Sequence, residues 1–318
     1  MGHAGDLKDA AVIEIGPGPG SLTRSILAAG APLVIAVEKD MRFAPSLSVL
    51  HSHYYSLSLS LEAVQMLEDA SQGRLIVAQG DILKVTPESL LETINKCFTQ
   101  CTVHPNDKRK QTNRGLHSVG RPPSKLHLIG NLPFNVATPL YIGWMHAITR
   151  RDGLFAKGLP PVQMTLMFQK EVAQRIVAGP NTEHRGRLSA LSQRTCRSKI
   201  VMELKGKTFV PPPKVDAAVV SVEPLEAPLP VSDPVIFEDV LRYCYHMRRK
   251  ALRHTLATVG PKYVEALGAS GIDPLARPQS LTTAEWCKLS DQLQALGWTP
   301  TSAYVPKRDR DEPRGRKV

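Results

Sequence analysis

Short apolar runs alternate with segments of helical spacing along the first part of the chain. Four runs have the length and composition of buried strands, at residues 10–15, 33–37, 75–78 and 126–129. Between the first two runs, Leu22, Ile26 and Leu27 recur at the spacing of one helix face. A strand, a helix and a second strand in this order form a βαβ unit. The pattern therefore predicts a wound α/β domain.

Strand-like segments cease after residue 222. Before that point the spacing predicts helices at 138–148, 169–178 and 185–193, and two late strands at 200–204 and 217–222 that can close the edge of the sheet. Residues 224–234 carry four prolines and indicate a linker. Beyond it the spacing is helical at 235–256, 263–267 and 284–296. We therefore expect a first domain at 1–223, a helical domain at 235–300 and a charged, disordered tail at 301–318.

The charge of the chain narrows the class of partner. Its formal net charge is +11 at pH 7, and its sequence pI is about 9.5. This balance favours nucleic acid over a membrane surface as the partner, although a basic solvated surface has the same composition. The five cysteines form no CxxC pair, so neither a zinc site nor a disulfide framework is indicated, and a reducing compartment is expected. No apolar run has the length of a membrane span.

The first predicted strand runs into a glycine-rich turn with the spacing GxGxG. Gly16, Gly18 and Gly20 alternate with two prolines, Pro17 and Pro19. Glycine lets the main chain approach a ligand closely, whereas proline removes the amide donors that a pyrophosphate needs. The turn therefore suits a ligand without phosphates, such as S-adenosylmethionine (SAM), although an ordinary structural turn has the same residues. Glu14, just before the turn, suits a cation better than a pyrophosphate.

Two acidic residues follow later strands at positions that suit a nucleoside. Glu38 ends the second strand, where a carboxylate can accept two hydrogen bonds from a ribose diol. Asp81 follows the third strand and can accept the adenine amino group, with Ile82 against the face of the ring. The alternative for Glu38 is a helix cap or a solvated side chain, and for Asp81 a turn residue.

The fourth strand ends in the cluster Asn131, Leu132, Pro133 and Phe134. The exocyclic amine of adenine is a poor nucleophile, because its lone pair is delocalised into the ring. The Asn131 side-chain oxygen and the Leu132 carbonyl can accept its hydrogens and localise that lone pair. Pro133 stiffens the turn, and Phe134 can stack on a base rotated out of its helix. Positioning then does most of the work of methyl transfer. The alternative is a plain turn with a core phenylalanine.

Basic residues are concentrated in the predicted helix at 235–256. At 100° per residue, Arg242, Arg249 and Arg253 share one face and Lys250 lies beside it. Such a face can bind RNA phosphates and release counterions, which orients the RNA without reading its sequence. A solvated basic face above an apolar one is the alternative.

Seven motifs in this order resemble the ribosomal RNA adenine dimethyltransferase family: EIGPGPG, VEKD, GDIL, GNLPFNVATPL, FQKEVAQRI, RLSALSQ and FVPPPKVDAAVV. The resemblance covers residues 5–222 and, more loosely, the helical part as far as 296. It implies an α/β fold, with a Rossmann-like SAM-dependent methyltransferase domain followed by a small all-helical domain. It also implies dimethylation of two adjacent adenines in a hairpin near the 3′ end of small-subunit rRNA.

The resemblance assigns roles to individual residues. The loop at Gly16 and Gly18 would hold the methionine part of SAM, Glu38 and Lys39 the ribose, and Asp81 and Ile82 the adenine. Asn131 would touch both cofactor and target base, and Phe134 would stack on the base. No metal is implied. The phrases VEKDMRF and NLPF look most like the mitochondrial branch of the family, which implies a monomer in mitochondria that acts on the assembling small subunit, with the mitochondrial transcription machinery as a further partner.

Two departures from the family pattern, and three rival functions, accompany this interpretation. A stretch containing a QNFL-like sequence usually precedes the first strand, and we expect that it is missing here. The basic loop at 105–124 is longer than usual, and we assign it no role.

The rivals are an NAD-dependent oxidoreductase, a DNA adenine methyltransferase, whose motif is typically (D/N)PP(Y/F), and a non-catalytic nucleic-acid-binding factor in ribosome assembly or mitochondrial transcription.

Overall fold

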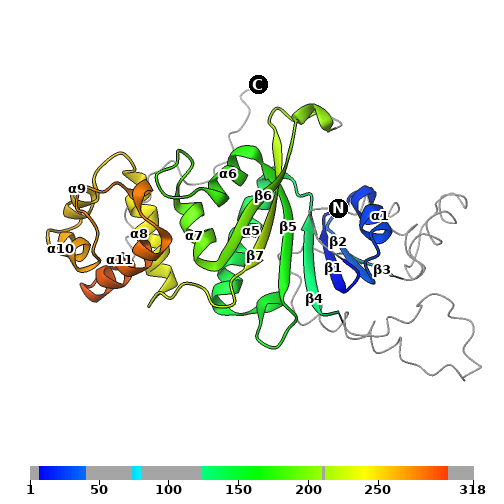
Figure 1. The fold of residues 1–318 in the computed structure, drawn as a ribbon, viewed down its shortest axis with the longest axis horizontal. Helices are drawn as coiled ribbons and strands as arrows, with labels where there is room; N and C mark the ends of the chain where they lie inside the picture. The colour runs from blue at the N-terminus through cyan, green and yellow to red at the C-terminus, as the bar shows by residue number, and fades with distance from the viewer. Residues whose placement is uncertain (1–6, 41–73, 80–122, 210–211, 300–318) are drawn as a thin grey trace, which may run out of the picture. The chain divides into compact units, whose positions relative to one another are not determined.

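The computed structural model describes residues 7–40, 74–79, 123–209 and 212–299 (Figure 1). The chain divides into two compact units. The first comprises Met1–Val177 and Thr195–Pro228, and the second comprises Ala178–Arg194 and Leu229–Val318. Residues 105–122 of the basic loop and the tail at 301–318 lie outside the described residues.

A seven-stranded sheet in the order β3-β2-β1-β4-β5-β7-β6 forms the first unit. The strands are β1 (Ala10–Ile15), β2 (Leu33–Glu38), β3 (Leu75–Gln79), β4 (Lys125–Gly130), β5 (Val162–Gln169), β6 (Cys196–Leu204) and β7 (Ala217–Pro224). The first five are parallel, and β7 and β6 are antiparallel additions at one edge. The βαβ prediction and the late strand pair at the edge are confirmed.

The central strands are buried on both faces, which explains their nearly continuous apolar sequences. Helix α1 (Ser21–Ala28) packs on the face that holds Val12 and Ile129. Helix α5 (Phe134–Arg150) packs on β5, where the rings of Tyr141 and Phe168 meet edge to face at 5.5 Å. Helix α6 (Lys170–Val177) contacts β5, β6 and β7.

Helix α5 begins four residues before the predicted start at 138. Pro133 is its N-cap residue, with φ −53°, and Pro139 lies inside the helix. The carbonyl of Pro133 accepts the amides of Val136 and Ala137 at 2.9 and 3.1 Å, so the first turn is already closed before Pro139 is reached. The Asn131–Phe134 turn therefore leads directly into a helix.

Helices make up the regular structure of the second unit, and its described residues contain no strand. They are α7 (Arg187–Thr195, which enters the first unit at its last residue), α8 (Pro234–His246), α9 (Leu252–Ala257), α10 (Lys262–Ala269) and α11 (Thr283–Ala295). Their core includes the fully buried side chains of Trp286, Leu267 and Leu289. Three short 3-10 helices complete the described regular structure: Gly153–Phe155 and Gly206–Thr208 in the first unit and Pro278–Ser280 in the second.

Residues 178–194 belong to the helical unit, although the sequence analysis placed them within the first domain. The reason is Arg185, whose side chain is fully buried. It donates to the carbonyl of Leu281 at 3.0 Å and to the hydroxyl of Thr283 at 3.1 Å. It also donates to the Ala178 carbonyl and to the Gln193 amide oxygen. These bonds tie the segment to the start of α11.

The prediction of one helix over 235–256 is wrong. Helix α8 ends at His246, a turn follows, and α9 begins at Leu252. The amides of Leu252 and Arg253 donate to the carbonyls of Ala276 and Pro274 at 2.8 and 3.1 Å. Because these tertiary bonds take the place of helical ones and Leu252 is fully buried, the chain bends here.

Among the helices the structure describes, none is long and apolar enough to cross a membrane.

Candidate functional site

Three of the predicted motifs lie at the carboxyl ends of the parallel strands, called here the carboxyl edge of the sheet. Gly16 follows β1, Glu38 is the last residue of β2, and Asn131 follows β4. Strand β1 lies between the other two, with Ile15 paired to Val37 on one side and to Gly130 on the other. The carboxyl ends of the parallel strands therefore gather these residues where open α/β sheets bind ligands.

The glycine turn has a backbone that other residues rarely adopt. Gly16 and Gly18 have φ values of +64° and +54°. The amide of Gly16 donates to the Val37 carbonyl at 2.9 Å, which holds the turn against β2. A Cβ at Gly18 would meet no atom within 4 Å, so this position needs glycine for its conformation and leaves open space beside it.

Glu38 joins the end of β2 to the glycine turn. Its Oε2 accepts the amide of Gly18 at 3.0 Å, and its Oε1 accepts the amide of Asp40 at 2.7 Å. The residue is only 8% exposed, whereas the adjacent Lys39 is exposed. Each carboxylate oxygen can accept a second hydrogen bond. Glu38 therefore holds the turn in place and keeps capacity for further donors, a link that the spacing from the turn alone did not show.

Glu14 lies beneath this turn in an unusual environment. It is fully buried, and among the described residues neither carboxylate oxygen has a hydrogen-bond partner. Burial raises its pKa from 4.5 to about 7, with a smaller contribution from the charge of Glu38, while the nearby Thr23 hydroxyl acts in the opposite direction. Near neutral pH a large share of Glu14 is therefore uncharged.

A second buried titratable group, His127, was missed by the sequence analysis. Its Nε2 lies 2.9 Å from the Thr165 hydroxyl. Burial lowers its pKa from 6.5 to about 4, and the charge of Lys125 adds to this. The register places Val12, Glu14 and His127 on the same face of the sheet, the face covered by α1. A histidine inside the apolar run of β4 was the available signal.

The Asn131–Phe134 turn is anchored through its second residue. Leu132 is buried, Asn131 and Pro133 are exposed, and Phe134 is half-buried at the start of α5. A Cβ built on Gly16 would lie 3.6 Å from Leu132 Cδ2, so Leu132 sits directly against the glycine turn. The two motifs are thus in contact, with the Asn131 side chain left accessible to solvent.

The basic residues predicted to bind RNA do not form one helical face. Arg249 and Lys250 lie in the turn after α8, and Arg253 lies in α9; all three are exposed. Arg242, in α8, donates to the buried carboxylate of Asp239. The other oxygen of that carboxylate accepts the indole N–H of Trp298 at 2.9 Å. The cations therefore divide into an exposed cluster at 249–253 and one paired arginine.

The predicted adenine-binding residues Asp81 and Ile82 lie outside the described residues.

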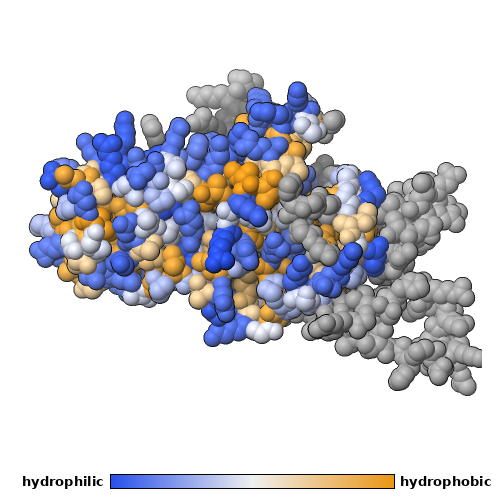
Figure 2. Space-filling view, viewed as in Figure 1, coloured by the Kyte–Doolittle hydropathy of each residue, from blue (hydrophilic) through white to orange (hydrophobic). Residues whose placement is uncertain are grey.

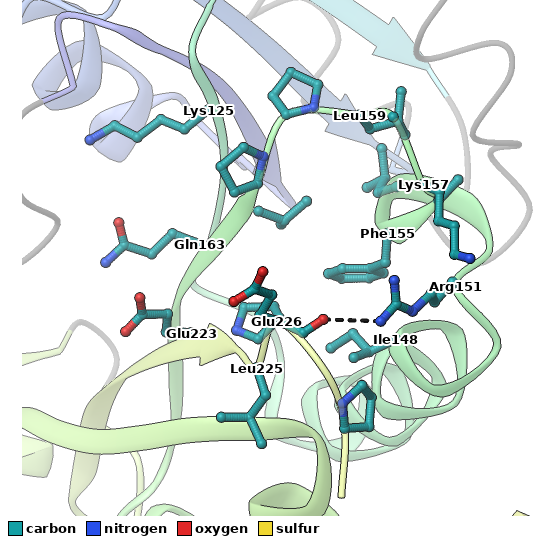
Figure 3. Close-up of a pocket in the computed structure, with 18 residues that line it drawn as sticks. Lys125, Ile148, Arg151, Phe155, Lys157, Leu159, Gln163, Glu223, Leu225 and Glu226 are labelled. Carbon is teal, nitrogen blue, oxygen red and sulfur yellow. Dashed lines mark hydrogen bonds between the residues drawn. The ribbon is translucent and has the colours of Figure 1, made fainter. Parts of the chain in front are cut away.

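A hollow of about 440 Å³ lies at the opposite edge of the sheet (Figure 3). Lys125 and Val162, at the amino ends of β4 and β5, line it together with the loop that follows α5. Arg151 crosses it and donates to the Glu226 carbonyl at 3.1 Å. None of the predicted site residues lines this hollow. Within the described ranges, no cluster of three or more His, Cys, Asp or Glu side chains could hold a metal.

Comparison with known proteins identifies the family. The model for "Ribosomal RNA adenine dimethylase" matches residues 3–295. The chain is 36% identical to "Dimethyladenosine transferase 1, mitochondrial" of Vermamoeba vermiformis, over 95% of this chain and 87% of that protein. It is also 36% identical to "Ribosomal RNA small subunit methyltransferase A" of Rhizobium meliloti, over 91% and 85%.

Solved structures agree at the level of the fold. A dimethyladenosine transferase from Plasmodium falciparum superposes with a TM-score of 0.59 at 20% identity, over 93% of this chain and 94% of that chain. The 23S rRNA methyltransferase ErmE superposes with a TM-score of 0.54 at 19% identity, over 92% and 94%. The predicted Rossmann-like methyltransferase fold is confirmed. The chain belongs to the ribosomal RNA adenine dimethylase family, whose members are SAM-dependent methyltransferases.

Proposed function

We propose that this enzyme dimethylates the exocyclic amino groups of two adjacent adenines in a hairpin near the 3′ end of mitochondrial small-subunit rRNA. The observation that carries the proposal is the contact between the glycine turn and the Asn131–Phe134 turn, through Leu132 and Gly16. Relatives named as mitochondrial dimethyladenosine transferases support the compartment. The enzyme then acts as a monomer on the assembling small subunit, with the transcription machinery as a further candidate partner.

The residues of the glycine turn fit SAM. The turn offers open space at Gly18, and its two prolines carry no amide donors for phosphates. Glu38 keeps acceptor capacity for ribose hydroxyls beside the exposed Lys39, and the turn at Gly16 would hold the methionine part. From the sequence alone, Asp81 and Ile82 would hold the adenine. When bound, SAM supplies an electrophilic methyl group on a positively charged sulfur.

The chain's own contribution to the reaction is the placement of acceptors around the target amine. The Asn131 oxygen and the Leu132 carbonyl grip its two hydrogens, so the nitrogen lone pair is localised. Because Leu132 is buried and Pro133 caps α5, the main chain that carries the Leu132 carbonyl is fixed before the base arrives. Their oxygens also stabilise positive charge that develops on the nitrogen. The half-buried Phe134 offers a ring on which the rotated base stacks.

The exposed cations at 249–253 bind the RNA backbone without sequence specificity. Arg249, Lys250 and Arg253 bind phosphates, which increases affinity but adds no base recognition. Arg242 contributes less, because its charge is already paired with Asp239.

The test is methyl transfer from labelled SAM to the unmodified 3′ hairpin of mitochondrial small-subunit rRNA. Asn131→Ala should lower kcat by about 100-fold, as expected for loss of a positioned electrostatic group. Gln163→Ala removes an amide side chain at the opposite edge of the sheet and is the matched control. RNA binding without methylation by the wild type would instead support a non-catalytic factor. Normal turnover of Asn131→Ala would remove Asn131 from the mechanism.

A further inference from the structure

The connection between β6 and β7 leaves the sheet at the same edge as the candidate site. In the register, Leu204 and Gln169 both pair with Ala217, while Gly130, the last residue of β4, pairs with Leu166. Gln169 is three residues beyond Leu166. At about 3.3 Å per residue, the connection starts about 10 Å past the end of β4. Figure 1 shows it projecting beyond the strands as an extended hairpin.

Asp216 fastens this connection at its base. Its Oδ1 accepts the amide of Gly206 at 3.0 Å, and its Oδ2 accepts the Lys205 ammonium at 2.9 Å. The Asp216 carbonyl accepts the amide of Lys170, the first residue of α6, at 2.9 Å. The Lys205 hydrogen bond and the Gly206 amide lower the pKa of Asp216, so the carboxylate is charged at neutral pH. The Asp216 side chain thus joins the two arms of the connection where they leave the sheet.

The two arms approach so closely that a side chain has no room between them. Gly206 is buried, and a Cβ there would lie 2.8 Å from the Pro213 carbonyl oxygen and 3.2 Å from that of Val215. Both neighbours are main-chain atoms, which cannot move aside as a flexible side chain can. The carbonyl of Gly206 in turn accepts the amide of Phe209 at 3.1 Å, so the position of Gly206 fixes that of Phe209.

The residues so held present positive charge and apolar surface. Lys207 and Lys214 are exposed, Phe209 is half-buried, and Val215 is 44% exposed. The carboxylate of Glu203, at the end of β6, is taken up by Lys170 at 2.7 Å. Hydrophilic and hydrophobic side chains adjoin on the surface where the connection lies (Figure 2). Cations beside an aromatic ring suit a single-stranded nucleic acid better than a protein of acidic surface.

We propose that Asp216 is a positioning residue for the RNA substrate. By holding Gly206 and Lys205, it places Lys207 and Phe209 against the single-stranded RNA that delivers the target base to Asn131. This rests on the proposed function, since it names how the substrate of that site is held. Asp216 touches neither base nor cofactor. Its loss should change the handling of RNA and leave SAM binding intact.

The experiment compares Asp216→Ala with Asp152→Ala, which removes another solvent-accessible aspartate, paired with Arg150 at 2.6 Å. We expect Asp216→Ala to speed hydrogen exchange at residues 205–209 and to raise KM for the rRNA hairpin about 10-fold or more, with SAM Kd unchanged. Asp216→Asn keeps an acceptor for the Gly206 amide and should recover part of the loss. Gly206→Ala displaces the same turn sterically and should reproduce the rise in KM. The Asp152 variant should match the wild type.

Three outcomes overturn the proposal. One is unchanged hydrogen exchange at 205–209. Another is an RNA KM equal to that of the wild type. The third is a parallel loss of SAM affinity, kcat and Tm, which would make Asp216 a purely structural residue. If the wild type itself does not methylate the hairpin, the proposed function fails, and the RNA affinity of the same variants, measured by fluorescence anisotropy, still decides the role of Asp216.

Discussion

Glu14 provides a test of the electrostatics beneath the glycine turn. Burial raises its pKa to about 7 in the folded chain, against 4.5 for an ordinary glutamate. The folded state therefore holds this proton more tightly than the unfolded state does. Stability from Glu14 is fully present below pH 4.5 and is lost as the pH rises towards 7. At about 1.4 kcal/mol for each pH unit between the two values, the loss is about 3 kcal/mol.

Glu14→Gln removes the titration and keeps the shape of the side chain. The difference in unfolding free energy between Glu14→Gln and wild type should grow in favour of the variant by about 2–3 kcal/mol from pH 5 to pH 8. Urea unfolding of the first unit can be followed by hydrogen exchange of the β1 peptide at each pH. This readout avoids mixing the two units in one transition. Effects of His127, whose pKa is lowered to about 4, occur in both proteins and cancel in the difference.

The matched control is Glu223→Gln, which makes the same chemical change at an exposed residue of β7. Its difference from wild type should stay nearly constant over the same pH range. A constant difference for Glu14→Gln as well would refute the reasoning, because it would mean that Glu14 is hydrated or paired in solution. A difference that grows towards acid would show that the folded state favours the charged carboxylate.

Three further predictions concern the cofactor, the helical unit and the RNA. Glu38→Ala should weaken SAM binding about 10- to 100-fold, because a charged acceptor worth about 1.5–3 kcal/mol is lost and the glycine turn is released; equal affinities by calorimetry would contradict this. Arg185→Met should destabilise the helical unit by about 2–4 kcal/mol in urea unfolding followed by hydrogen exchange of the α11 peptide; an unchanged midpoint would contradict this and show that water replaces the lost hydrogen bonds. Replacing Arg249, Lys250 and Arg253 by Ala should lower the slope of log RNA affinity against log salt by about 2–3 without altering SAM affinity; an unchanged slope would leave these cations without a role.

The sheet could be predicted because its central strands are buried on both faces. Burial of every residue of β1 and β2 leaves continuous apolar runs in the sequence. Strand β5 was harder to assign, since its apolar stretch leads directly into α6 and no turn residue separates them. The partners of each strand could not be derived from periodicity alone. The insertion of β4 beside β1, which brings Asn131 to Gly16, depends on crossovers that span many residues.

The helical unit shows why local spacing was insufficient. Residues 235–256 have a helical pattern throughout, yet Ala276 and Pro274, more than twenty residues away, supply the carbonyls that bond Leu252 and Arg253. A face calculated at 100° per residue is meaningless across that bend. The pairing of Arg242 with Asp239 spans only three residues and was open to prediction, as an i, i+3 pair on one helix.

The site itself was only partly accessible from the sequence. Glu38 was predicted as a ribose-binding residue from its spacing in the sequence from the glycine turn, but its bond to the Gly18 amide depends on how the turn folds back over β2. Likewise, Asp216 lies in a motif that the sequence made conspicuous, yet its role depends on Gly206, ten residues earlier. Such contacts depend on the tertiary structure and produce no periodic pattern in the sequence.

Buried polar atoms without a hydrogen-bond partner among the described residues occur at several places in the first unit, including Nδ1 of His127 in β4. The carboxylate of Glu14 and the hydroxyl of Thr23 are two more such groups, and both lie close to the glycine turn. Orphaned groups of this kind cost about 1–3 kcal/mol each, and they persist where function requires them. A ligand present at 100 times its Kd stabilises the folded state by about 2.7 kcal/mol, which is enough to offset such a cost. A ligand bound beside the glycine turn would thus offset the cost of burying Glu14 and Thr23.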